Sequence, residues 1–175
     1  MAVTTAKWLG GLIDIVMAFR PIDMQDAAGE HVTGDWVSLK NWDRAICVLM
    51  GGVGTAGQDP VFTIDQATTN AGGSAKTLTF DSIYRKQAAT DLLSTGVWAL
   101  TTQTAAGTYT NADAAEQVKI HCVEIKATDL DVDGGFDHIR MTIPDVGGAA
   151  QLGAGLYILC GPRYPNAPAN VLSPL

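Results

Sequence analysis

Eight short runs of β-branched, aromatic and aliphatic residues constrain the fold more than any other feature of the sequence. They occupy residues 36–39, 44–50, 61–64, 77–84, 97–102, 118–125, 136–143 and 155–160. Breaks rich in glycine, asparagine, aspartate and threonine, such as residues 70–73 and 105–107, separate them. Short strands with frequent turn signals are typical of all-β proteins, and we predict a single-domain β-sandwich or jelly roll.

The two ends of the chain differ from this series. Apolar residues within 8–19 recur with the spacing of one helical face, although a Gly-Gly pair would weaken a helix there. The same stretch also alternates like an extended arm, and in either case Arg20-Pro21 is expected to end the element. We assign an N-terminal arm or helix to residues 1–33, the β-sandwich to 34–160 and an extended, proline-rich C-terminal tail to 161–175.

The composition indicates that the chain has little charge to spread over a surface. Charged residues make up 17% of the sequence and hydrophobic residues 47%. Such a chain either buries an unusual share of itself or presents an apolar surface to another protein, and we favour the second interpretation. The net charge of −7 argues against nucleic acid or an anionic membrane as a partner.

Residues 52–57 spell G-x-G-x-x-G, the pattern of a dinucleotide-binding loop. That function requires a helix to open at the last glycine, but the β-prone sequence Val-Phe-Thr-Ile follows at residues 61–64. We therefore interpret the loop as a connection between two strands and expect no cofactor.

A second motif, Asp129-x-Asp131-x-Asp133-Gly, resembles the first half of a calcium-binding loop. The twelfth position of an EF-hand requires glutamate, and here it is Arg140. We predict a hairpin turn and no metal, with the three aspartates as weak candidates for a looser cation site.

The sequence contains no recognisable catalytic set. The three histidines are scattered, and the three cysteines form no C-x-x-C pair, which indicates free thiols; these residues are His31, His121, His138, Cys47, Cys122 and Cys160. We expect that the protein is not an enzyme.

Five stretches resemble sequences of small head-decoration (cement) proteins of tailed bacteriophages. They are GDWVSLKNWDR at 34–44, FTIDQAT at 62–68, AGGSAKTL at 71–78, VEIKATDLD at 123–131 and Arg-Tyr-Pro at 163–165. The resemblance implies a non-enzymatic virion protein that binds the outside of the assembled capsid through the major capsid protein and stabilises it. It also implies a homotrimer, located on the capsid surface after assembly in the host cytoplasm.

The two terminal segments are the candidate contact arms of such a protein. Large apolar and aromatic residues dominate the energetics of interfaces, so we expect Trp8, Leu12 and Phe19 to act as anchors, unless they cap the domain's own core. Arg163 and Tyr164, at the start of the tail, complete the set of candidate interface residues.

Two other functions remain open on the sequence alone. A phage tail or baseplate component would also be rich in β-structure. A calcium-dependent module for carbohydrate or receptor binding would use the Asp129 to Asp133 loop, with Trp42 or Trp98 stacking on a sugar.

Overall fold

The protein is a sandwich of two antiparallel sheets. The computed structural model describes residues 9, 11–25, 32–88, 98–110, 117–144 and 148–163. Sheet A has the strand order β1 (Ile13–Asp23), β12 (Leu152–Pro162), β4 (Trp42–Gly51), β10 (Val118–Lys126), β7 (Phe80–Ala88) and β8 (Ala99–Ala106).

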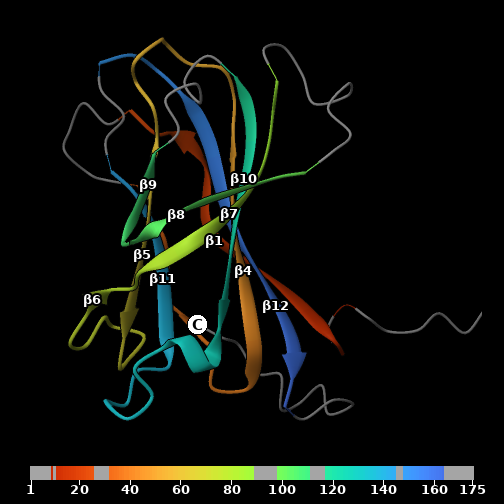
Figure 1. Cartoon of the computed structure of the whole chain (residues 1–175), viewed down its shortest axis with the longest axis vertical. Helices are drawn as coiled ribbons and strands as arrows, with labels where there is room; N and C mark the ends of the chain where they lie inside the picture. The colour runs from red at the N-terminus through yellow and green to blue at the C-terminus, as the bar shows by residue number, and fades with distance from the viewer. Residues whose placement is uncertain are drawn as a thin grey trace, which may run out of the picture.

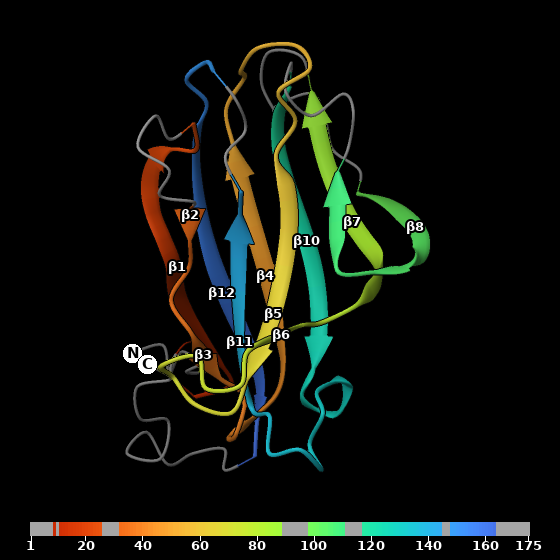
Figure 2. The ribbon, with the colours of Figure 1, turned by 90° about the vertical axis from the view of Figure 1, so that its left-hand side faces the viewer.

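Sheet B packs face to face against sheet A, as Figures 1 and 2 show. Its main path is β2 (Val32–Thr33), β11 (His138–Ile143), β5 (Val61–Ala67) and β6 (Lys76–Thr77), with β3 (Val37–Ser38) paired to β11 and β9 (Thr108–Thr110) paired to β5. The all-β prediction is confirmed. None of the described residues forms a helix that is long and apolar enough to cross a membrane.

Alternation along the strands builds the core between the sheets. In β4 the side chains of Ala45, Cys47 and Leu49 are fully buried and belong to the core cluster. Ile139 and Met141 of β11 are equally buried on the facing sheet. Because successive strand side chains point to opposite faces, the residues between these positions face away from the core.

Tyr157 of β12 ties the two sheets together through its hydroxyl group. The hydroxyl accepts a hydrogen bond from Met141 N at 2.8 Å and donates one to Asp35 O at 3.0 Å. Burial raises the pKa of the Tyr157 phenol well above its ordinary value, so the group stays protonated and able to donate.

The N-terminal helix prediction is wrong for the described part of that segment. Residues 13–23 form β1 at the edge of sheet A, and the strand passes through Arg20-Pro21 instead of ending there. β-Bulges accommodate the proline, because the register shifts between Met17 and Phe19 and again between Phe19 and Ile22. The expected arm is therefore, over these residues, an integral strand of the sandwich.

The structure confirms the prediction for the glycine loop and contradicts the one for the aspartate loop. Residues 52–60 connect β4 to β5 without a helix, and Gly57 adopts a φ of +76°, so the prediction of a strand-to-strand turn is confirmed. The predicted hairpin at residues 129–134 is wrong, because β10 belongs to sheet A and β11 to sheet B. A short 3₁₀ turn, η1 (Ala127–Asp129), begins this crossing between the sheets.

Candidate interaction surface

An uncharged row of side chains crosses the outer face of sheet A from one edge to the other. Cross-strand pairing places one residue from each of the six strands in a single row, Met17, Leu156, Val48, Cys122, Tyr84 and Leu100. None of these side chains is charged. An antiparallel sheet that faces water on one side normally carries polar residues there, so this face has the composition of a covered surface.

The outward direction of this row follows from the strand period. Val48 and Cys122 are 6% and 9% exposed, yet neither belongs to the core cluster between the sheets. They lie at the centre of the outer face, where their cross-strand neighbours cover them. The adjacent row extends the apolar surface over three strands, with Ile15 paired to Ile158 and Ile158 to Ile46, and then reaches Glu124 of β10.

Most of the large apolar side chains that the described residues leave exposed lie on or beside this face. Six of eleven stand at outward positions of sheet A: Ile15, Met17, Met50, Tyr84, Leu100 and Leu152. Leu9 and Leu12 precede β1, and Trp98 precedes β8 with the Lys86 ammonium 4.9 Å from its ring centroid. Only Val53 and Val132 lie in loops elsewhere.

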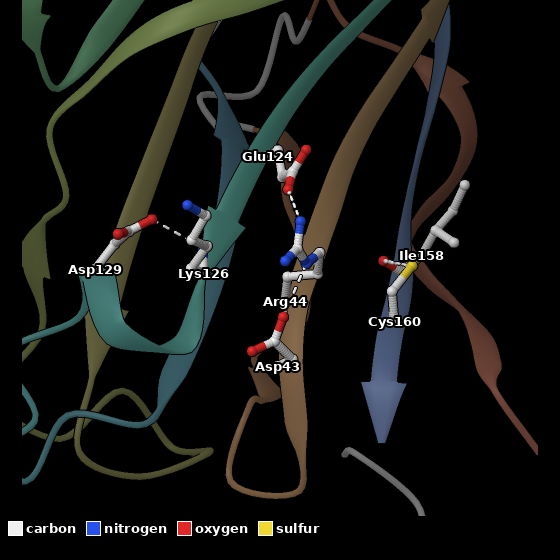
Figure 3. A network of polar contacts seen from close by, with 7 residues as sticks. All are labelled: Asp43, Arg44, Glu124, Lys126, Asp129, Ile158 and Cys160. Atoms are coloured by element: carbon white, nitrogen blue, oxygen red, sulfur yellow. Dashed lines mark hydrogen bonds and ion pairs between the residues drawn. The ribbon is translucent and has the colours of Figure 1, made fainter. Parts of the chain in front are cut away.

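Charged side chains flank the uncharged row on both sides: Glu124 lies two residues from Cys122 on β10, and Lys86 lies two residues from Tyr84 on β7. At one end of β4, Arg44 donates to Asp43 Oδ2 at 2.9 Å and to Glu124 Oε1 of β10 (Figure 3). Lys126 lies opposite Arg44, and Lys86 stands toward the other end of the sheet. Glu124 is paired with Arg44, and the six residues of the row itself carry no charge.

The outer face of sheet B is built from the same alternation but with polar residues. One row runs through Thr33, Thr142, Thr63 and Thr108. In the next row Arg140 donates to Asp65 Oδ2 at 3.0 Å, and Thr77 donates to the other oxygen of the same carboxylate at 3.3 Å. The Arg140 guanidinium also lies 4.5 Å from the Trp36 ring, so the chain itself covers this aromatic residue.

The structure places the predicted contact residues apart from one another. Leu12 is 41% exposed, just before β1, and lies at the edge of the apolar face. Arg163 follows β12, and its backbone amide donates to Asn41 O at 2.9 Å. Trp8 and Tyr164 lie outside the described residues.

Phe19 lies in the core, which corrects the expectation that it is a surface anchor. The bulge at Ala18 shifts Phe19 from the outward parity of Ile15 and Met17 to the inward one. Gly155 makes the space, because a Cβ atom at that position would lie 2.3 Å from the Phe19 ring.

The residues that the sequence analysis missed are those of the uncharged row on sheet A. Their available signal was the unbroken apolar run 45–50, which is typical of a strand covered on both faces.

The aspartate loop is occupied by internal contacts. Asp129 accepts from Lys126 N at 2.9 Å, while Asp131 accepts from Gly134 N at 3.0 Å and pairs with Lys76. The Lys76 ammonium, followed by the Gly134 amide, lowers the pKa of Asp131. Asp133 is exposed, and no group of three or more metal-ligating acidic, histidine or cysteine residues occurs in the described chain. Trp42, one of the two candidate sugar-stacking residues, is buried.

Two polar side chains are buried between the sheets, on the inner side of β10. Lys119 and His121 are each 1% exposed; Lys119 Nζ donates to Gly52 O at 3.0 Å, and His121 Nε2 lies 3.3 Å from Gln87 Oε1. Burial, with Lys119 and Arg85 nearby, lowers the pKa of His121 to about 4. His121 is therefore neutral at pH 7, with its ring edge-on to Tyr109 at 5.8 Å.

The three cysteines are free, and Cys160 lies opposite Arg44 on the neighbouring strand. Cys47 points into the core, whereas Cys122 and Cys160 are on the outer face of sheet A. Burial raises the pKa of the Cys122 thiol to about 11 and also raises that of Cys47. These thiols therefore stay protonated at pH 7.

No protein-family model matches the chain, and no curated protein matches it. Among solved structures, the chain is similar to the crystal structure of SPBc2 prophage-derived protein YomS. The alignment covers 90% of this chain and 99% of that one, at 9% sequence identity and a TM-score of 0.39.

Proposed function

We propose that this chain is a non-enzymatic structural protein of a tailed-phage particle and that it acts by protein–protein association through the outer face of sheet A. The observation that supports association is the uncharged row that crosses all six strands of that sheet. The phage assignment rests on the resemblance of residues 34–165 to decoration proteins.

In its specific form, the proposal is a decoration protein that binds the major capsid protein on the outside of the assembled shell. Such a protein stabilises the closed shell if it binds the shell more tightly than it binds free capsid subunits. The protein would assemble in the host cytoplasm and remain on the capsid surface. Its chemistry requires no cofactor, metal, nucleic acid or membrane.

Capsids of the phage that encodes the chain, prepared without it, provide the test. Purified protein is added in calcium and in chelator, and the capsids are sedimented and then heated. We expect saturable co-sedimentation under both conditions and a higher temperature of capsid disruption. Binding to tails instead of capsids would favour the tail or baseplate alternative, and binding only in calcium would favour the carbohydrate or receptor module.

A further inference from the structure

The geometry points to a second copy of this chain as the occupant of the apolar face, packed sheet against sheet across a two-fold axis. This inference rests on the proposed function in one respect, since both assign the outer face of sheet A to protein association. It names a second copy as the partner on that face, so the capsid protein would bind the pair through other surfaces. It also replaces the homotrimer implied by the resemblance with a symmetric pair.

The size of the face matches what a stable pair needs. Six strands of eight to eleven residues, spaced about 4.8 Å apart, give a face of roughly 24 by 33 Å. Its area is therefore roughly 800 Å², the area that each partner contributes to an interface of standard size. Sheets of this kind stack about 10 Å apart with their side chains interdigitated.

The charge distribution favours a partner of the same kind. At the centre of the face, Val48, Cys122 and Leu156 carry no charge, so a two-fold operation brings no like charges together there. Around this centre, Arg44, Lys86 and Lys126 accompany two acids, Asp43 and Glu124, which are both paired with Arg44. The acidic residues that give the chain its net charge of −7 thus lie mainly elsewhere, and repulsion between two copies is weakest at this face.

Symmetry selects a pair over a trimer. A patch that packs against its own equivalent generates a two-fold axis, whereas a ring of three requires two different patches on each copy. Within the described residues the large exposed apolar side chains gather on one face, and the opposite face of the sandwich is polar. A single self-complementary patch closes after two copies.

Sedimentation equilibrium of the full chain over a wide concentration range tests this inference without capsids. We expect a species of twice the 18.4 kDa chain mass. Met17→Lys and Leu100→Lys, at positions 58% and 54% exposed, should each weaken association about 100-fold, because each charge enters the interface twice. Val132→Lys is the matched control: the residue is 61% exposed in the loop after β10, and we expect the wild-type constant.

Each other outcome overturns the inference. A wild-type chain that is monomeric or trimeric throughout contradicts the two-fold pair. A dimer that survives both lysine substitutions, or that Val132→Lys disrupts equally, contradicts the choice of face. Circular dichroism of each variant verifies its fold, and the wild-type mass decides the matter if a variant fails to fold. A dimer that does not bind capsids would refute the proposed function alone, whereas a monomer that binds them would refute this inference alone.

Discussion

Side chains alternate between inward and outward positions in both sheets, but the outer face of sheet B is polar and that of sheet A is largely apolar. On sheet B, outward positions hold threonines and an Arg140–Asp65 ion pair, the usual arrangement for a sheet that meets water. On sheet A, the equivalent positions hold methionine, leucine, valine and tyrosine. The backbone period therefore determines which residues face outward, and the residue types determine which face is polar and which is apolar.

The comparison also separates two kinds of stabilisation. Residues between the sheets, such as Tyr157 and His121, contribute to the free energy of unfolding. Residues on the outer face of sheet A are expected to contribute to association, and those on the outer face of sheet B to little beyond local pairing. Stability and association can be measured independently, so the difference can be tested from each side.

The largest expected effect comes from giving sheet A the chemistry of sheet B. The triple variant Met17→Thr, Tyr84→Thr and Leu100→Thr removes three exposed apolar side chains from one row. We expect self-association to weaken about 1,000-fold, because several anchors are lost from each copy. The double variant Val53→Thr and Val132→Thr is the control. Association of the triple variant at wild-type strength, measured by sedimentation, would remove the distinction between the faces.

A somewhat smaller effect is expected from His121, which belongs to the interior that both sheets share. Its pKa is about 4 in the folded protein, against about 6.5 for an unperturbed histidine. The stability that this neutral residue contributes is complete above pH 6.5 and is lost as the pH falls toward 4. The loss amounts to about 3 kcal/mol.

Urea unfolding between pH 7 and pH 4 measures this contribution. His121→Gln should show a shallower loss of stability on acidification than the wild type. Parallel curves for the two proteins would show that His121 does not titrate as its burial requires.

Removing the hydroxyl of Tyr157 should cost about 2 kcal/mol of unfolding free energy, since it leaves the buried Met141 N–H without the hydrogen bond that it donates to this oxygen. Chemical denaturation of Tyr157→Phe checks the value. Tyr84→Phe is the matched variant on the outer face of sheet A, where we expect no change in unfolding. Equal effects of the two substitutions would contradict the division between interior and surface.

The smallest effect is expected on the polar face. Asp65→Asn removes the ion pair with Arg140, whose side chains are 18% and 26% exposed, and should cost about 1 kcal/mol without changing association. Asp43→Asn, at a 58% exposed carboxylate, should have a smaller effect on thermal unfolding. A change in oligomeric mass with Asp65→Asn would show that sheet B also takes part in association.

Much of the fold could be predicted from local sequence. The β-prone runs became strands because their residue types suit a pleated, half-buried surface, and the glycine loop became a turn because no helix could open after it. The low charge content predicted an apolar surface, and the unbroken run 45–50 contains part of the apolar face of sheet A.

Other features depended on contacts that no local pattern contains. The apolar residues of the N-terminal stretch fit both the two-residue period of a strand and the repeat of one helical face. Only pairing with β12 makes this segment a strand. The bulge at Ala18 then shifts the alternation of side chains by one residue, and this shift places Phe19 inside. Likewise, an Asp-Gly turn predicts a reversal of the chain but not whether the next strand joins the same sheet.

The sequence by itself determined that this protein is all-β, where most of its strands lie and that it is poor in charge, because these properties depend on local residue types and on composition. Only the tertiary structure decided which side chains form the apolar face. That row runs from Met17 of β1 to Leu100 of β8 through five strand pairings, and a shift of one residue in any register would turn a strand's outward side chains toward the core.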